Sequence, residues 1–274
     1  AKKPCVPFFF IFSYEKGNEI IKDISLKIEK GKKIVFLGEN GSGKSTLFLI
    51  MNGLHKPEKG NLYFEGEKIN YKKKELDNLR QKVGIVFQDP DIQIFAPTVM
   101  QEIAFGLKNL GYSNDKIEEY AKIAMREVEI ENLRETPCHY LSYGQKKRVS
   151  IASIIAMMPE ILILDEPLAW LDPKNKKRVL EILLNLSKEG KTMVVSTHDV
   201  NFAYDFADYV FILRDGKIAK SGSKKEIFND FDFLKKANLD VPTIVKMYSY
   251  LKKEKDLDFD EFINNYNEFL KENF

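Results

Sequence analysis

The stretch that decides the fold is Gly38-Glu39-Asn40-Gly41-Ser42-Gly43-Lys44-Ser45, which fits the pattern G-x-x-x-x-G-K-[ST]. It directly follows a β-rich run at residues 33–37 and precedes a predicted helix at 46–51. Glycines let consecutive backbone N–H groups turn inward around phosphate oxygens, and the helix presents its positive end to them. We therefore predict that this segment and Thr46 bind nucleotide phosphates, with Lys44 at the β and γ phosphates and Ser45 at Mg²⁺.

Two further apolar runs complete the core of the predicted sheet. Residues 161–164 and 193–196 are almost continuously apolar, which is typical of central strands in a mostly parallel sheet, and each run ends at polar residues. From Ile20 onward, short β-rich runs alternate with helical stretches, so we predict a layered α/β fold.

A helical segment interrupts this alternation between Gln88 and Pro159. Apolar residues recur at helical spacing over 98–107 and 116–128, and a further helix begins near Gly144. Later, β-rich runs on both sides of Asp215-Gly216 predict a hairpin, and Gly222 closes the domain. We predict a nucleotide-binding domain over residues 1–222, with helices inserted at about 88–158, and a C-terminal extension over 223–274.

Two carboxylates, Asp165 and Glu166, end the apolar run at 161–164. Acids at the end of a buried strand lie where phosphate and magnesium are expected. The first suits a Mg²⁺ contact, often through water, and the second suits a general base that polarises the attacking water. Because the same chain carries a phosphate loop, we predict a metal ligand in Asp165 and a catalytic base in Glu166.

Composition excludes several classes of protein. The 274 residues are 44% hydrophobic and 31% charged, enough to bury a core in one large domain or two small ones. Lys and Arg number 43 against 41 Asp and Glu, so the net charge of +2 predicts no nucleic-acid partner. No run approaches the roughly 18 to 20 apolar residues that span a bilayer. The two cysteines, Cys5 and Cys138, are too few for a disulfide framework and indicate a reducing compartment.

The apolar run at residues 6–12 follows Lys2 and Lys3 and could imitate a secretory signal. The run is about seven residues long, contains Pro7 and starts after Cys5, whereas the apolar region of a signal is longer and would precede a lipidated cysteine. We therefore predict a strand that ends at Ser13 and Tyr14.

The C-terminal extension and the basic clusters are both predicted to be helical. Apolar residues recur at helical spacing near the end of the chain, at Phe259, Phe262, Ile263, Tyr266, Phe269 and Leu270. They predict an amphipathic helix that either packs on its own domain or contacts another subunit. The basic clusters at 72–74, 146–148 and 174–178 are predicted to be solvated helix faces.

The segment Leu141-Ser142-Tyr143-Gly144-Gln145 precedes a helix and resembles the signature of the ATP-binding cassette (ABC) family, usually L-S-G-G-Q. Three other segments resemble family motifs and occur in the family's order: Gln88 the Q-loop glutamine, Leu171-Asp172 the D-loop, and Thr197-His198-Asp199 the switch-histidine motif. The resemblance spans about residues 8–222. It implies a P-loop NTPase core with an antiparallel β subdomain, an inserted helical subdomain and a small C-terminal helical extension.

The resemblance also implies roles for residues around one nucleotide. Gln88 would serve Mg²⁺ and catalysis, and His198 would sense the γ-phosphate. Tyr14 would stack on adenine, or else is an ordinary tyrosine at a strand end. The implied activity is ATP hydrolysis, with ATP and Mg²⁺ bound together.

A second copy of the cassette is also implied. The signature residues Ser142, Gly144 and Gln145 would contact the γ-phosphate bound by a partner, so two sites form only in a head-to-tail dimer. Loss of the γ-phosphate contacts on hydrolysis would let the dimer open.

The stretch at residues 87–99, FQDPDIQIFAPTV, narrows the resemblance to the ATPase subunits of energy-coupling factor transporters, including the cobalt and nickel type. Gln145-Lys146-Lys147-Arg148-Val149 and Met158-Pro159-Glu160 match the same subunits. The resemblance implies a peripheral subunit at the cytoplasmic face of the membrane, in a homo- or heterodimer with a second ABC ATPase. Its other partners would be a transmembrane coupling subunit and a small membrane protein that captures a vitamin or transition-metal ion.

The surface that meets the coupling subunit is expected at about residues 89–105, around Ile94 and Phe95. Three other functions stay open: the ATPase of an ordinary ABC transporter, a non-transport ABC protein, and a regulatory subunit with little turnover.

Two motifs depart from the family pattern. Tyr143 replaces the first signature glycine, and its Cβ restricts the backbone if that position needs a positive φ. In the D-loop, Trp170 stands where the family usually has glycine, and Leu168 where it often has threonine. We hypothesise that the chain pairs with a different ATPase whose surface accommodates Tyr143 and Trp170.

Overall fold

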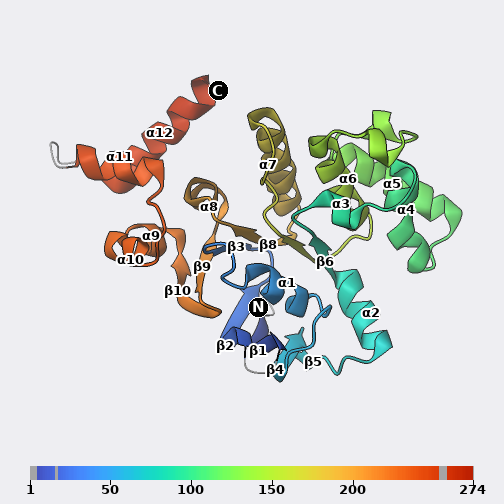
Figure 1. Cartoon of the computed structure of the whole chain (residues 1–274). Helices are drawn as coiled ribbons and strands as arrows, with labels where there is room; N and C mark the ends of the chain where they lie inside the picture. The colour runs from blue at the N-terminus through green and yellow to red at the C-terminus, as the bar shows by residue number, and fades with distance from the viewer. Residues whose placement is uncertain (1–4, 16–17, 253–257, 274) are drawn as a thin grey trace.

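The chain is built around a mixed sheet with strand order β10-β9-β3-β8-β7-β6 (Figure 1). The computed structural model describes residues 5–15, 18–252 and 258–273, without the side chains of 5–15, 18, 260, 267 and 269–273. The strands pair in parallel except β9 with β10, which form the predicted hairpin. They are β3 (Lys33–Leu37), β6 (Val83–Val86), β7 (Ile161–Leu164), β8 (Thr192–Thr197), β9 (Tyr209–Arg214) and β10 (Lys217–Ser223).

Both faces of this sheet are covered. Along β3, Ile34 and Phe36 belong to one apolar cluster while Val35 and Leu37 belong to another, because side chains alternate across a strand. Helix α1 (Lys44–Met51) covers the first of these faces. The helices α7 (Pro173–Lys188) and α8 (Val200–Phe206) cover the second (Figure 1). The continuous apolar runs in the sequence are thus strands buried on both sides.

A second, antiparallel sheet has the order β2-β1-β4-β5. It consists of β1 (Cys5–Glu15), β2 (Asn18–Glu29), β4 (Lys59–Phe64) and β5 (Glu67–Lys68). Ile24 and Ile28 of β2 and Leu62 of β4 pack in the same cluster as α1. The predicted N-terminal strand is confirmed in its backbone, and the antiparallel sheet confirms the expected β subdomain.

Between β6 and β7 the chain forms the helical insertion, at one end of the main sheet (Figure 1). It contains α3 (Pro90–Gln93), α4 (Val99–Asn109), α5 (Asn114–Glu127), 3-10 turns at Glu131–Leu133 and Cys138–Tyr140, and α6 (Tyr143–Ile155). Helix α2 (Lys73–Lys82) precedes β6 and contains most of the basic cluster at 72–74, which is exposed as predicted.

The C-terminal extension leaves the main sheet after β10 and forms α9 (Lys224–Phe228), α10 (Phe231–Lys236), α11 (Thr243–Leu251) and α12 (Phe259–Asn273). Phe259, Phe262, Ile263 and Tyr266 pack, partly buried, against the large apolar cluster, to which α9, α10 and α11 of the extension also contribute. The rings of Phe259 and Phe262 contact that of Tyr248 in α11. The side chains of Phe269 and Leu270 lie outside the described residues. The amphipathic helix is confirmed, and the described part of its apolar face packs on its own chain.

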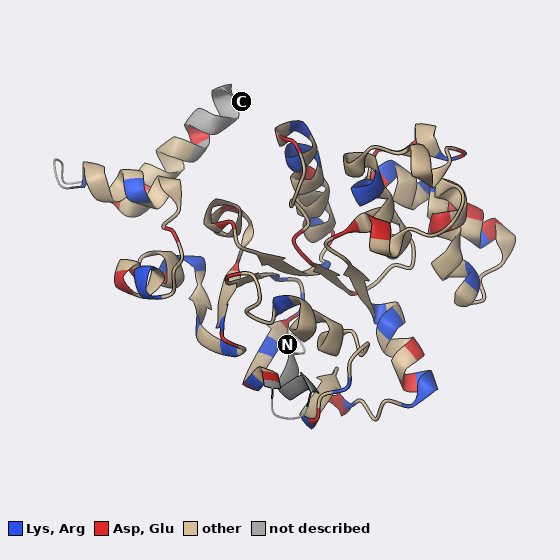
Figure 2. Ribbon diagram, viewed as in Figure 1, with Lys and Arg blue, Asp and Glu red and all other residues tan. Residues whose placement is uncertain are grey.

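One prediction about charge is wrong. Acidic and basic residues are interspersed along the described ribbon (Figure 2), but Lys147 and Arg148 are buried. They lie on α6, which packs against α3, α4, α5 and β6, so that tertiary contacts surround it. The basic cluster at 146–148 is therefore not a solvated helix face.

Among the described residues, no helix combines the length and the apolar character needed to cross a membrane.

Candidate nucleotide site

The loop between β3 and α1 has the shape of a phosphate cradle. Gly41 and Gly43 have φ of 81° and 103°, a backbone region that favours glycine. A Cβ on Gly38 would stand 2.3 Å from the carbonyl oxygen of Leu213 in β9, so no side chain fits there. The glycines of the motif thus meet two different demands, backbone freedom at two positions and close packing at the third.

The β9–β10 turn supports this loop from outside. The Gly216 N–H donates to the carbonyl of Ser42 over 3.1 Å, and the Lys22 N–H donates to the carbonyl of Gly216 over 2.8 Å. A Cβ on Gly216 would lie 2.0 Å from the carbonyl of Ile20. The hairpin predicted at Asp215-Gly216 is therefore a part of the site's framework.

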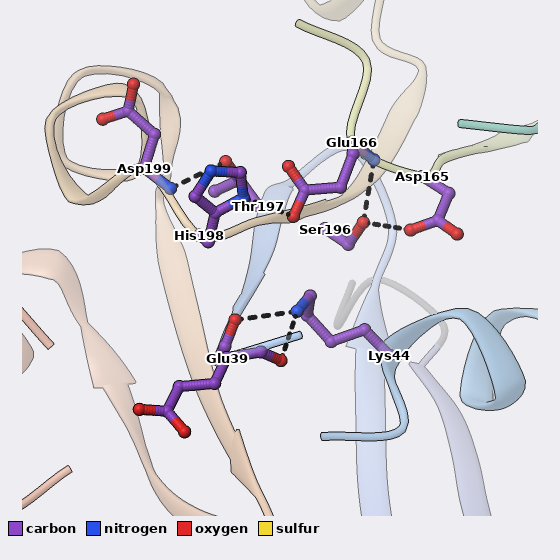
Figure 3. Close-up of polar contacts among 9 residues, drawn as sticks. Glu39, Lys44, Asp165, Glu166, Ser196, Thr197, His198 and Asp199 are labelled. Atoms are coloured by element: carbon purple, nitrogen blue, oxygen red, sulfur yellow. Dashed lines mark hydrogen bonds and ion pairs between the residues drawn. The ribbon is translucent and has the colours of Figure 1, made fainter. Parts of the chain in front are cut away.

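Lys44 is buried at the start of α1, and its ammonium donates to the carbonyls of Gly38 and Glu39 over 2.7 and 3.0 Å (Figure 3). Burial lowers the pKa of Lys44, and the negative charges of Glu166 and Asp165 oppose that shift. The hydroxyl of Ser42 is buried with no hydrogen-bond partner. A buried cation and an unpaired hydroxyl inside a glycine cradle fit an anion such as a phosphate group.

Both carboxylates directly follow β7, and their partners lie at the end of the neighbouring strand β8. Ser196, at the end of β8, donates its hydroxyl hydrogen to Asp165 and accepts the N–H of Glu166 over 2.9 Å (Figure 3). Nδ1 of His198 lies 3.0 Å from Oε1 of Glu166. The His198 side chain is 60% exposed while that of Glu166 is 8% exposed, so the imidazole stands at the open side of the carboxylate.

Glu166 has a φ of 43°, which is uncommon for a residue with a side chain. Such backbone strain costs on the order of 1 kcal/mol and persists where neighbouring contacts hold it. Here the Ser196 hydroxyl and His198 provide those contacts on the two sides of the residue. The strain therefore accompanies a carboxylate whose position is determined by a second strand.

Gln88 follows β6 and is held through its backbone. Its carbonyl accepts hydrogen bonds from the ammonium of Lys147 and, over 3.4 Å, from the hydroxyl of Tyr143, both on α6. Lys147 also donates to the carbonyl of Phe87 over 3.1 Å. Burial lowers the pKa of Lys147 to about 8, against the opposing charges of Asp165, Asp89 and Glu166.

The predicted signature segment starts α6. The Ser142 hydroxyl accepts the N–H of Gln145 over 3.3 Å, and the Gln145 side chain accepts the N–H of Ser142 over 2.8 Å, which forms a capping box. A Cβ on Gly144 would stand 2.5 Å from the side chain of Asn175 in α7. A side chain at position 144 would therefore displace Asn175, and the Gln145 side chain stabilises the helix start.

The condition under which a side chain at position 143 would restrict the backbone is not met. Tyr143 is the first residue of α6 and has no positive φ, whereas Trp170 has a φ of 60°. The backbone conformation that favours glycine thus occurs in the D-loop and not in the signature.

The site residues predicted from the sequence form two groups in the structure. The phosphate loop with Lys44, Ser45 and Thr46 meets Asp165, Glu166 and His198, which the electrostatic effects on Lys44 reflect. Helix α6, with Ser142, Gly144 and Gln145, packs on the other face of the sheet from α1. The side chain of Tyr14 lies outside the described residues, although its backbone belongs to β1.

A metal ion could find ligands only in part from the protein. In the described part of the chain, no group of three or more His, Cys, Asp or Glu side chains is arranged so that it could hold a metal ion by itself. Ser45 is exposed at the first turn of α1, and Asp165 is at the facing strand end. These oxygen donors fit Mg²⁺, which in nucleotide sites takes most of its ligands from phosphate and water.

Ser196 and Lys147 were missed as site residues. Ser196 ends an apolar strand run, the same signal that identified Asp165, so it could have been found from the sequence. Lys147 lies in a basic cluster, which predicts a solvated helix face and not a buried residue near the site.

The fold and the site together define a P-loop nucleotide-binding protein, with the phosphate cradle and the carboxylates at the ends of parallel strands. The family profile described as "ABC transporter" matches residues 21–169. The chain therefore belongs to the ABC transporter family, and it is an ATPase.

Two similar proteins indicate which subgroup of the ABC transporter family this chain resembles. The energy-coupling factor transporter ATP-binding protein EcfA of Methanocaldococcus jannaschii is 45% identical over 90% of this chain and 88% of its own length. The structure of cbiO1 from Clostridium perfringens, described as part of the ABC transporter complex cbiONQ, matches with a TM-score of 0.77 at 37% identity, over 91% of this chain and all of that one. The resemblance to energy-coupling factor ATPases is thereby confirmed.

A third relative shows a nucleotide state. It is a dimeric ABC cassette bound to ADP and Pi after hydrolysis, with a TM-score of 0.72 and 28% identity, over 80% of this chain and 98% of that one.

Proposed function

We propose that this chain is the ATP-hydrolysing subunit of an energy-coupling factor importer for a vitamin or a transition-metal ion. The observation that carries the proposal is the contact of Glu166 with His198, at the strand ends that face Lys44. A buried carboxylate with a histidine beside it, opposite a phosphate cradle, is suited to activating water next to a terminal phosphate. The relation to EcfA supports the transport role over an ordinary ABC transporter or a regulatory subunit.

Each side chain has a defined task in this proposal. Glu166 accepts a proton from the attacking water, and His198 orients that carboxylate through Nδ1 while its exposed edge contacts the γ-phosphate. Lys44 exchanges its two carbonyl partners for phosphate oxygens, which replaces neutral acceptors by charged ones. Gly38, Asn40, Gly41, Ser42, Gly43 and Thr46 complete the cradle.

Mg²⁺ would be held by Ser45 and Asp165, with Gln88 beside them, and would neutralise charge on the phosphate oxygens. In this chain, Ser196 orients Asp165 toward that position through its hydroxyl. Tyr14 is proposed to stack on the adenine ring.

The site is completed by a second cassette. In this proposal Ser142 and Gly144 contact the nucleotide bound by the other protomer, and α6, which carries them, packs on the opposite face of the sheet from α1. The free N–H groups at the start of α6, together with the Ser142 hydroxyl, suit the γ-phosphate bound by that protomer. The dimeric relative with ADP and Pi supports this arrangement.

The surface toward the membrane partner is proposed on the helical insertion. Phe95 is 64% exposed and its ring meets Phe105 edge to face, with centroids 4.6 Å apart, while Ile92 is exposed nearby in α3. The buried carboxylate of Glu102 accepts the N–H groups of Phe95 and Ala96 over 3.1 and 2.9 Å, which holds this loop. Ile94 packs against the core, so Phe95 and not Ile94 is the docking residue.

The partners are a second ABC ATPase, a transmembrane coupling subunit and a small substrate-capture membrane protein, with the chain at the cytoplasmic face of the membrane. A tagged pull-down from detergent-solubilised native membranes tests this set. We expect all three partners by mass spectrometry, and recovery of soluble or ribosomal proteins alone would contradict the transport role.

Hydrolysis is tested separately with Glu166→Gln. The amide keeps the contact to His198 but loses the base, so ATP binding persists while kcat falls by about 100-fold or more. An unchanged kcat would remove Glu166 from the mechanism.

A further inference from the structure

The segment that carries Gln88 is attached to α6 by side chains along its length. Tyr143 and Lys147 bond the carbonyl of Gln88, as described above. One turn further, the Gln93 side chain donates to the carbonyl of Ser150 over 2.8 Å and accepts the N–H of Phe87 over 3.1 Å. Residues 87–93 and α6 are therefore connected at both ends of the segment.

Lys147 differs from the other connections because its side chain is completely buried, with 0% exposure. Burying an ammonium group is costly unless it is paired and hydrogen-bonded. The two acceptors of Lys147 are both backbone carbonyls, of Phe87 and Gln88, where β6 ends. A charge-assisted bond to a carbonyl determines the course of the backbone in a way that an exposed ion pair does not.

Lys147 also stands between two groups of the proposed site. In one direction it is four residues after Tyr143, on the same face of α6 and one turn from the signature segment. In the other direction, Asp165 and Glu166 are close enough for their charges to act on it. Lys147 thus contacts the segment that carries Gln88, and it belongs to α6, the helix proposed to contact the partner protomer.

We propose that Lys147 is a positioning residue that couples Gln88 to α6, the helix that carries the signature segment. Through this coupling, binding of ATP in one site moves the signature segment that contacts the nucleotide in the other site. The inference rests on the proposed function, because that function assigns Gln88 and the signature their roles. The simpler alternative is that the buried ammonium only stabilises the helical insertion.

The chain contains its own reporter for this coupling. Trp170 is the only tryptophan in the sequence, is 67% exposed, and its ring contacts Tyr143 with centroids 6.0 Å apart. Tyr143 in turn bonds the carbonyl of Gln88. A shift of the segment relative to α6 would therefore change the surroundings of the indole.

The test compares Lys147→Met with Lys147→Gln and Lys146→Met in the full chain. Methionine matches the lysine stem as far as Cε and lacks the ammonium donors, and glutamine keeps a neutral donor. Lys146 is the adjacent lysine and also connects α6 to this segment, but through a partly exposed ion pair with Asp91 that spans 2.6 Å. It therefore serves as the matched control for an exposed connection. The readouts are the affinity for Mg-ATP, the change in Trp170 emission on adding Mg-ATP in a Glu166→Gln background, and kcat with Glu166 present.

For Lys147→Met we expect ATP affinity within about threefold of the parent, loss of at least about half of the Trp170 response, and a kcat about tenfold lower. Lys147→Gln recovers part of both losses, and Lys146→Met changes neither by more than about twofold. A full Trp170 response and full kcat in Lys147→Met, with only a lower melting temperature, would overturn the proposal. So would the inability of both Lys147 variants to fold.

The two hypotheses fail in different ways. If the parent chain hydrolyses no ATP with its partners present, the proposed function fails, while the emission readout still tests Lys147. If the parent hydrolyses ATP but its Trp170 emission does not change on adding Mg-ATP, the proposed coupling through Lys147 is contradicted and the proposed function is not.

Discussion

The indole ring of Trp170 lies edge-on to the phenol ring of Tyr143, with ring centroids 6.0 Å apart and ring planes at 68°. Both residues stand where the ABC family's motifs usually have glycine, and in the fold they contact each other. The contact joins the loop after β7 to the first turn of α6. The two departures are therefore one structural feature, and a partner cassette would meet them together.

Trp170 should be quenched readily by acrylamide in the free chain, because the indole is 67% exposed. Tyr143→Ala removes the ring that covers one edge and should increase the quenching constant further. Adding Mg-ATP to the Glu166→Gln variant should lower it by about twofold or more as a second cassette covers the loop. Stern–Volmer plots measure all three, and quenching unaffected by ATP would place Trp170 outside the dimer contact.

Lys44→Met should weaken ATP binding without lowering the stability of the fold. Since burial lowers the pKa of Lys44, the protonated ammonium is less stable in the folded chain than in water. The variant is expected to unfold at the same or higher urea concentration and to bind ATP at least about tenfold more weakly. Equilibrium unfolding and a nucleotide titration measure the two, with the exposed Lys27→Met as control. Unchanged ATP affinity would contradict the phosphate role.

Ser196→Ala should affect stability and catalysis together. It removes the donor to Asp165 and leaves the buried N–H of Glu166 without its acceptor, which costs about 1 to 3 kcal/mol in unfolding free energy. The freed Glu166 backbone, at a φ of 43°, should also relax, and kcat should fall. Ser221→Ala, on exposed β10, is the matched control for urea unfolding and steady-state kinetics. A loss of stability with kcat intact would limit Ser196 to a structural role.

Phe95→Asp should uncouple transport from hydrolysis. A charge in the exposed Phe95–Phe105 pair opposes docking on an apolar partner without touching the nucleotide site. ATP affinity of the isolated chain should be unchanged, while copurification of the membrane partner and substrate uptake are lost. Phe231→Asp, at an exposed position of α10, controls for charge alone. Loss of ATP binding in Phe95→Asp would show that Phe95 is a core residue.

Cys138 should resist alkylation in the folded chain. Burial raises the pKa of its thiol to about 11, so at pH 8 only about one thiol in a thousand is the reactive thiolate, and this fraction rises tenfold per pH unit. Peptide mapping after iodoacetamide treatment distinguishes Cys138 from Cys5. Labelling should rise sharply once urea unfolds the chain. Rapid labelling of Cys138 under native conditions at pH 8 would contradict its burial.

Much of the fold was predictable because its signals are local. The strands at Lys33–Leu37 and Ile161–Leu164 end where the sequence predicts, since an apolar run stops at a glycine in one case and at two acids in the other. The start of α6 was also predictable, because Ser142 and Gln145 form a capping box within four residues. The candidate site follows from the same patterns, since parallel strands bring their polar ends to one edge.

Other features depend on segments far apart in the chain. A Cβ on Gly216 would meet the carbonyl oxygen of Ile20, and one on Gly144 would meet the side chain of Asn175, contacts that no local sequence pattern predicts. The positive φ occurs at Trp170 and not at Tyr143, because only the surrounding packing decides which residue bears the strain.

By itself the sequence determined the class of fold, the order of its motifs and the residue types at the nucleotide site. Hydrophobic periodicity and the ends of apolar runs are local patterns that can be identified from neighbouring residues alone. The tertiary structure alone decided which of two adjacent lysines is a surface charge and which is buried. Lys146 reaches Asp91 at the surface, while Lys147 is enclosed by the end of β6. Burial depends on what packs around a side chain, and those neighbours come from elements up to 60 residues away.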